Sequence, residues 1–151
     1  MPLTESLEDL MPGLCYGCGT LNEHGHQIKS YWDGEVSRCT WEPESYHHGG
    51  ANFLYGGIIA SLLDCHMCLT GIVGLYAREG RIVGDDNGPQ LYAVTANLNV
   101  DYLKPTPLAG PVDLTATIDS VDGRKIRVSG TLGRDGVVMA KATGLFIQVD
   151  R

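Results

Sequence analysis

One segment constrains the fold of this chain more than any other: an apolar stretch from Ile58 to about Arg78. Its apolar residues recur three and four positions apart, which predicts a helix. A helix that is apolar on most sides has to be surrounded by other elements and cannot lie on a surface. The sequence therefore predicts one long helix wrapped by the rest of the chain. The apolar positions are Ile58, Ile59, Leu62, Leu63, Leu69, Ile72, Val73 and Tyr76.

The segments on both sides of this helix alternate between apolar and polar residues, which is typical of strands with one buried face. Asp-Gly pairs, which favour hairpin turns, separate several of them. We expect an α+β fold in which one long central helix is wrapped by a curved antiparallel sheet of five to six strands. Two strands precede the helix and four follow it as a meander. The expected strands are 27–32, 35–41, 93–104, 112–119, 126–132 and 137–149.

Length and charge limit the class of protein. The 151 residues suffice for a single domain over 1–151, in which 1–24 form an N-terminal lead and a turn-rich segment. Eighteen acidic against 11 basic residues give a net charge of −7, which argues against nucleic acid or a membrane surface as a partner. Asp64 interrupts the longest apolar run, so we expect no membrane span. The acidic N-terminus lacks signal-peptide features, and a cytoplasmic location is expected.

Two features of the helix point to chemistry. Gly56 and Gly57 precede it, and the free amides at a helix start favour negative charge on a nearby oxygen. Asp64 lies inside the apolar run, where a carboxylate costs free energy unless it is paired or faces a wet cleft. It is a candidate general base or nucleophile, or else a structural residue bonded to the backbone or to His66. We expect His66 itself to point away from Asp64.

Spacing along the helix bears on assembly. Asp64 lies seven residues after Gly57, about 10 Å along the helix axis, which is too far for both to act on one carbonyl. A second, antiparallel copy of the helix closes this gap. If both features act in catalysis, the active unit is at least a dimer with its sites at the interface.

Three stretches resemble motifs of one known family. YGGIIASLLDCH (55–66) resembles the H-G-G-x-x-x-x-x-x-D signature of PaaI-type hotdog thioesterases, in the 4-hydroxybenzoyl-CoA thioesterase-like superfamily. VTANLNVDYLKPTPLAGP (94–111) resembles their T-x-x-L-x-V-x-Y-L-x-P-x-P signature. CYGCGTLNEHGHQI (15–28) is similar to the C-x-x-C-G-x-x-N-x-x-G opening of some members. The similarity covers nearly the whole chain, and the three motifs follow one another in the family's order.

The resemblance implies a hotdog fold, a homodimer with a continuous sheet, a homotetramer built from it, and hydrolysis of an acyl-CoA thioester. It implies that the amide of Gly56, or that of Gly57, polarises the thioester carbonyl. It further implies that Asp64 of the partner chain activates water or attacks the carbonyl directly. Thr95 matches a position where family members place a hydroxyl near the carboxylate.

The sequence departs from the family pattern near the helix start. Tyr55 stands where the family has His, which replaces an imidazole with a phenol that can still donate a hydrogen bond. No Asn aligns with the family's water-holding residue, and His48 or Asn52 can take its place. The loop from Arg78 to Gln90 is longer than in the shortest members.

Substrate contacts are expected on two surfaces. CoA carries several phosphates, so an acidic protein needs a local basic patch to bind it. For this patch we expect Arg124 and Lys125, with Lys104, Arg78 and Arg81 as further candidates. For the wall of the acyl pocket we expect Phe53, Leu54, Ile58 and Ile59, and we expect Asn52 and Tyr55 to contact the substrate as well.

Five cysteines in a chain without secretion signals are expected to be reduced thiols. We expect no metal and no cofactor, although Cys15-x-x-Cys18 and Cys65-x-x-Cys68 leave a zinc-binding interaction module open. The hotdog fold itself is compatible with two functions besides thioester hydrolysis. One is that of a non-catalytic acyl-CoA-binding protein. The other is that of a hotdog enoyl-CoA hydratase, whose G-D-x-N-P-x-H stretch is not found here.

Overall fold

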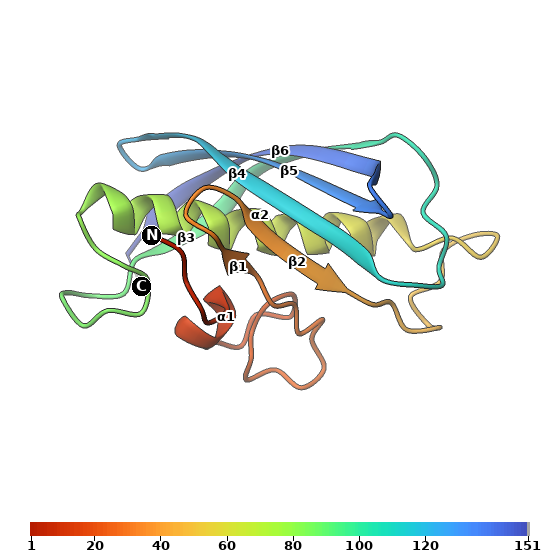
Figure 1. The fold of residues 1–151 in the computed structure, drawn as a ribbon, viewed down its shortest axis with the longest axis horizontal. Helices are drawn as coiled ribbons and strands as arrows, with labels where there is room; N and C mark the ends of the chain where they lie inside the picture. The colour runs from red at the N-terminus through yellow and green to blue at the C-terminus, as the bar shows by residue number, and fades with distance from the viewer. Residues whose placement is uncertain (151) are drawn as a thin grey trace.

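The computed structural model describes residues 1–150. One long helix lies under a curved antiparallel sheet of six strands (Figure 1). The elements in chain order are α1 (Leu7–Leu10), β1 (Tyr31–Trp32), β2 (Ser37–Trp41), α2 (Gly56–Arg78), β3 (Tyr92–Tyr102), β4 (Val112–Asp122), β5 (Lys125–Arg134) and β6 (Val137–Val149).

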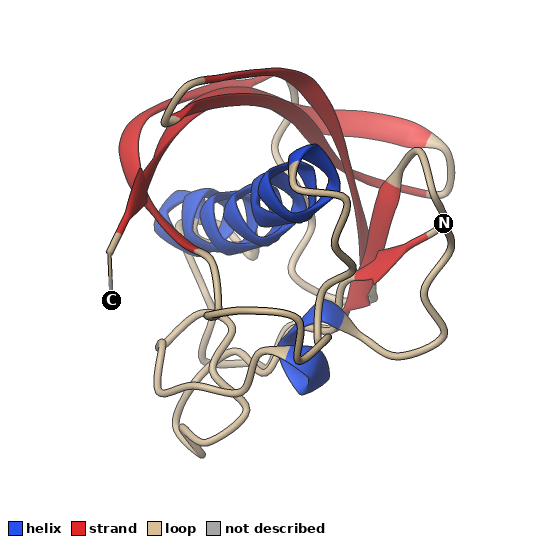
Figure 2. Ribbon diagram, turned by 90° about the vertical axis from the view of Figure 1, so that its left-hand side faces the viewer, coloured by secondary structure: helices blue, strands red, loops and turns tan. Residues whose placement is uncertain are grey.

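The predicted central helix is confirmed as α2, which begins two residues earlier than expected, at Gly56. Figure 2 shows the sheet arching over α2, while loops of the N-terminal segment lie on the open side. The helix packs against β2 to β6, and every residue from Leu69 to Tyr76 is buried. The helix is therefore apolar on most sides because other elements surround it, as expected.

The expectation that no segment reaches the length of a membrane span is wrong for α2. The helix continues through Asp64, and by length and composition alone it could cross a membrane. However, 67% of its most apolar window is buried inside the protein. Such burial is what a core helix shows, because the sheet already covers its apolar surface.

The strand order is β1-β2-β4-β5-β6-β3, so the expected four-strand meander is wrong in one respect. The three strands β4, β5 and β6 do follow one another through tight turns at Gly123 and Gly136, both with positive φ. Strand β3 instead lies at the far edge and pairs with β6. The Pro-containing connection after Tyr102 carries the chain across to β4, which pairs with β2.

A β-bulge at Ala96 corrects the predicted alternation of β3. The register with β6 shifts between Thr95 and Asn97. Before the bulge the odd-numbered residues face the helix, and after it the even-numbered residues do. Ala93 before the bulge is buried, and Leu98 after it packs against the core. Thr95 consequently shares the inner face with Leu98 and is turned toward α2. Strict alternation without a bulge would place Thr95 and Leu98 on opposite faces of the sheet.

A buried polar chain links the short helix α1 to α2. The Ser30 amide donates to Glu8 Oε2 at 2.7 Å, and the Ser30 hydroxyl contacts His66 Nδ1 at 2.8 Å. His66 Nε2 lies 3.1 Å from the Ser37 carbonyl oxygen. His66 thus points away from Asp64, as predicted, and has a structural role. Burial lowers its pKa to about 4.

His66 should make folding stability depend on pH. Between its ordinary pKa of 6.5 and about 4, the unfolded chain binds a proton at His66 that the folded chain does not. The free energy of unfolding is therefore expected to fall by about 3 kcal/mol as pH drops through this window. Urea unfolding from pH 7.5 to pH 4 would measure this fall, with His66→Gln as the comparison.

The comparison with His66→Gln is needed because burial raises the pKa of Glu8. Titration of Glu8 changes the free energy of unfolding in the direction opposite to that of His66. A carboxyl that ionises reluctantly in the fold favours stability at lower pH. The difference between wild type and His66→Gln isolates the histidine. The interpretation fails if both proteins lose stability equally on acidification.

Candidate active site

A cavity of about 270 Å³ lies between α2, β3 and the N-terminal segment. Asp64 lines it from α2 and Thr95 lines it from β3. The Thr95 hydroxyl donates a hydrogen bond to Asp64 Oδ1 at 2.6 Å. The bulge in β3 makes this contact possible, because it turns Thr95 toward the helix. The structure therefore brings together two of the predicted catalytic residues.

Sequence reasoning missed most of the cavity wall. Leu69 and Ile72 follow Asp64 along α2, and their helical spacing could have indicated a shared face. The opposite wall comes from Met11 to Leu14 and from Glu8, which is 1% exposed. Within residues 1–150, Glu8 Oε1 has no hydrogen-bond partner. No local pattern predicts these contacts, because they join a turn-rich segment to a distant helix. The complete lining is Glu8, Met11, Pro12, Gly13, Leu14, Cys15, Cys18, Gly19, Asp64, Cys65, Cys68, Leu69, Ile72, Gln90, Tyr92, Ala93, Val94 and Thr95.

The start of α2 presents the backbone amides that the sequence predicted. Gly56 is the first helical residue and Tyr55 is the N-cap, with no side-chain cap bond. The first amides of a helix lack acceptors within the helix. The Tyr102 hydroxyl donates to the Gly56 carbonyl oxygen at 2.7 Å, which joins the end of β3 to this turn. A Cβ at Gly57 would lie 2.6 Å from the Tyr55 ring, so the phenol covers the glycine closely.

His48 and Asn52 lie together in the loop before α2. His48 Nε2 is 3.1 Å from Asn52 Oδ1, and its Nδ1 contacts the Gly49 carbonyl oxygen. Both side chains are exposed, and Asn52 adopts a positive φ of 64°. Neither residue lines the cavity around Asp64 of the same chain.

The expected acyl-wall residues do not line this cavity either. Leu54 is 4% exposed and packs in the core, with its amide bonded to the Thr106 carbonyl. Phe53 is 38% exposed, and Ile58 is partly buried against the core. All three lie near the helix start, six or more residues before Asp64. They could approach that cavity only from a second chain.

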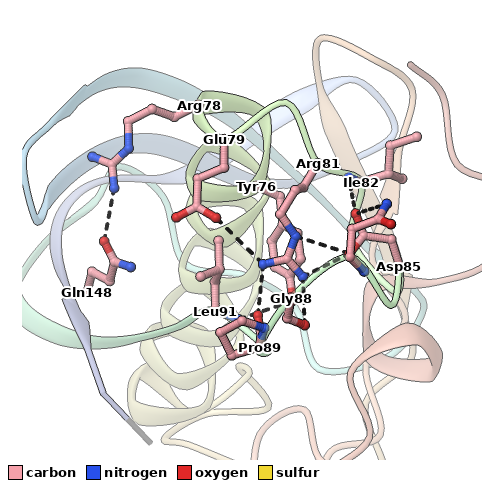
Figure 3. A network of polar contacts seen from close by, with 11 residues as sticks. Tyr76, Arg78, Glu79, Arg81, Ile82, Asp85, Gly88, Pro89, Leu91 and Gln148 are labelled. Atoms are coloured by element: carbon pink, nitrogen blue, oxygen red, sulfur yellow. Dashed lines mark hydrogen bonds and ion pairs between the residues drawn. The ribbon is translucent and has the colours of Figure 1, made fainter.

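Arg81 is not free to bind a phosphate (Figure 3). Its guanidinium contacts Asp85 at 2.8 Å, donates to the carbonyls of Gly88 and Pro89, and lies 4.8 Å from the centre of the Tyr76 ring. The hydrogen bond from Arg81 lowers the pKa of Asp85 to about 2. This network folds the 78–90 loop back on itself, so the candidate role of Arg81 is replaced by a structural one.

Arg124 and Lys125 lie at the β4–β5 turn, beside the end of α2 that is remote from Gly56. Arg78 at that end donates to the Gly123 carbonyl, and to Gln148 Oε1 at 3.0 Å. Arg124 is exposed and lies 3.6 Å from Asp150. Fourteen residues of helix, about 21 Å, separate Asp64 from Arg78. The structure thus does not bring these cations to the cavity.

Three cysteines form one corner of the cavity. Cys15 Sγ and Cys65 Sγ are 3.7 Å apart, and Cys18 completes a group whose sulfurs lie within 4.8 Å of one another. The hydrogen bond from Cys65 lowers the pKa of Cys15 to about 4, aided by the amides of Cys18 and Gly17. The same contact raises the pKa of Cys65. None of the five cysteines, all of which lie within residues 1–150, forms a disulfide.

Comparison with known proteins identifies the family. The model of the thioesterase superfamily matches residues 51–138. The acyl-coenzyme A thioesterase THEM4 of Xenopus laevis is 31% identical over 113 residues, which cover 74% of this chain and 44% of that protein. The chain thus spans less than half the length of the curated relatives it matches.

Solved structures agree with the family model. A thioesterase superfamily protein from Shewanella loihica matches with a TM-score of 0.63 and 32% identity, over 85% of this chain and 96% of that one. A Bacillus halodurans protein solved with CoA matches with a TM-score of 0.61 and 27% identity, over 82% and 72%. The chain belongs to the thioesterase superfamily and has its hotdog fold, as the three sequence motifs predicted.

Proposed function

We propose that this protein hydrolyses an acyl-CoA thioester to a free acid and CoA. The observation that carries the proposal is the Asp64–Thr95 pair, joined at 2.6 Å on the wall of a largely apolar cavity. Membership of the thioesterase superfamily supports this reaction, as does the name of the THEM4 relatives. The CoA bound in the Bacillus halodurans neighbour supports a CoA ester as the substrate.

The chemistry divides between two helix positions. The Gly56 or Gly57 amide at the positive end of α2 stabilises the carbonyl oxygen as it becomes an oxyanion. Asp64 takes a proton from water as the water attacks the carbonyl carbon, or it attacks that carbon itself. The C–S bond then breaks, and the CoA sulfur leaves as thiolate and takes up a proton. Where Asp64 is the nucleophile, the acyl group is now an anhydride with Asp64, and water hydrolyses it to the free acid and restores the carboxylate. Thr95 holds the Asp64 carboxylate in position through its hydroxyl.

A second copy of the chain supports this division. Gly56 and Asp64 of one chain lie about 12 Å apart along α2, beyond the reach of one carbonyl. Strand β3 is a long edge strand, and it exposes apolar side chains at Val94 (44%) and Tyr102 (52%). Such an edge favours pairing with another strand. We place β3 of two chains side by side in a homodimer, so that the glycines of one chain face Asp64 of the other, with a homotetramer as the further assembly.

A panel of CoA esters tests the reaction. Short, long and aromatic acyl-CoAs are incubated with the protein, and free thiol is measured with a disulfide reagent. Catalytic thiol release supports the proposal and reports the acyl preference. Hydration of an enoyl-CoA without thiol release, or binding of CoA esters without turnover, would contradict it.

Replacing Thr95 by Val should impair turnover while keeping the shape of the strand. The valine cannot donate to Asp64 Oδ1, and a hydrogen bond to a charged group contributes about 1.5–3 kcal/mol. We therefore expect kcat to fall by about 10- to 100-fold. Thr95→Ser keeps the hydroxyl and should retain most of the activity. Equal activity of the Ser and Val variants would show that the contact has no role in the reaction.

A further inference from the structure

We propose that Cys15, Cys18 and Cys65 bind a zinc ion on the wall of the Asp64 cavity. The three sulfurs come from two parts of the chain, a turn near the N-terminus and the middle of α2, and lie within 4.8 Å of one another. Thiolates are preferred ligands of zinc, and C-x-x-C in a turn is a common half of a zinc site. This proposal differs from the expectation of no metal.

Sulfur spacing fits an ion better than a bond between sulfurs. With Zn–S bonds of about 2.3 Å, the sulfurs of a tetrahedral site lie about 3.8 Å apart. Cys15 Sγ and Cys65 Sγ lie 3.7 Å apart. A disulfide needs about 2.05 Å, so these two side chains would have to move together to form one.

The surrounding backbone is shaped around the sulfurs. A Cβ at Gly17 would overlap the Cys65 sulfur, so the turn approaches α2 as closely as only glycine permits. The amides of Gly17 and Cys18 point at the Cys15 sulfur. Hydrogen bonds to backbone carbonyls hold the turn, such as Gln27 Nε2 to Gly19 O at 2.9 Å.

A polar contact between His26 Nε2 and Ser61 Oγ at 2.9 Å also holds the turn-rich segment on the helix. The segment's large apolar side chains Leu14, Tyr16 and Leu21 are 73%, 57% and 66% exposed, so hydrophobic burial contributes little. An ion shared with Cys65 would tie this segment to α2. Binding exchanges the thiol protons for the ion, and the protons pass to solvent.

The fourth position of the ion faces the cavity. Cys15, Cys18 and Cys65 all line it, as does Asp64. Cys68 also lines it, but its sulfur is turned to the Ala93 carbonyl at 3.6 Å and lies outside the group of three. We therefore assign three protein ligands, with water or a ligand in the cavity at the fourth position. This assignment does not depend on the proposed thioesterase activity.

Metal content of the 151-residue chain tests the assignment. Protein purified under reducing conditions is loaded with zinc, desalted and analysed by mass spectrometry for elements. About one zinc per chain is expected, with loss in Cys15→Ser, Cys18→Ser and Cys65→Ser and retention in Cys68→Ser. Loss in Cys68→Ser would overturn the three-sulfur assignment, and a zinc content near zero in the wild type would overturn the site itself.

Spectroscopy on the wild-type protein tests the zinc site without any variant, so the result does not depend on whether the cysteine variants fold. X-ray absorption at the zinc edge should show about three sulfur neighbours at about 2.3 Å. Cobalt in place of zinc should give the intense visible bands of a tetrahedral thiolate site. Only nitrogen and oxygen neighbours would overturn the proposal, as would a Cys15–Cys65 disulfide in the protein as isolated under reducing conditions.

Discussion

Replacing Asp64 by Asn is expected to reduce acyl-CoA turnover by about 10²- to 10⁴-fold, the usual contribution of a general base. The amide cannot take a proton from water or attack a carbonyl. However, it has nearly the same shape, and its oxygen can still accept the hydrogen bond from Thr95. The fold should be kept or slightly stabilised, because an uncharged group is easier to bury among apolar neighbours. Thiol release at saturating substrate measures the effect.

Asp86→Asn is the matched control, because Asp86 is an exposed acid in the loop after α2 and lies outside both the cavity and β3. It loses the same charge and should keep full activity. Thermal unfolding and circular dichroism of both variants show whether the fold is retained. Turnover near the wild-type level in Asp64→Asn would contradict the assigned role of Asp64.

Local sequence signals predicted the parts of the fold that depend on local physics. The Asp-Gly turns before Arg124 and Val137 placed two hairpins correctly, because the favoured φ of these residues fixes the turn. The helix was placed within two residues, since its apolar positions follow its own period. The position of β3 at the sheet edge was not predicted, because partner choice depends on contacts between distant segments.

The difference between local signals and contacts between distant segments also explains which site residues could be predicted. Asp64 could be found because a carboxylate inside an apolar run violates the local pattern. Thr95 was found through a family motif, and its orientation depends on the bulge at Ala96, which period-two alternation cannot reveal. Glu8 and Met11 were missed because only tertiary packing brings the N-terminal segment against α2. Cys65 stood in a weak C-x-x-C pattern, and its partners proved to be Cys15 and Cys18, without Cys68.

The second prediction with a large effect distinguishes an active site shared by two chains from one contained in a single chain. Gly56→Pro removes one amide N–H from the start of α2, at the helix position that best tolerates proline. Tyr55 has φ −58° and ψ 130°, which is compatible with a following proline. Loss of one oxyanion donor is expected to cost about 10²- to 10³-fold in kcat. Gly56→Ala keeps the amide, and its Cβ would meet the Tyr102 ring at 3.5 Å, an ordinary contact.

Mixing Gly56→Pro chains with Asp64→Asn chains, followed by dissociation and reassembly, should then restore activity. In a mixed dimer one site combines the intact glycine of one chain with the intact aspartate of the other, while the second site carries both defects. About half of randomly assembled dimers are mixed, so about a quarter of wild-type activity is expected. Each variant reassembled alone should stay inactive. If Gly56 and Asp64 of the same chain served one site, every site in the mixture would carry a defect and no activity would return.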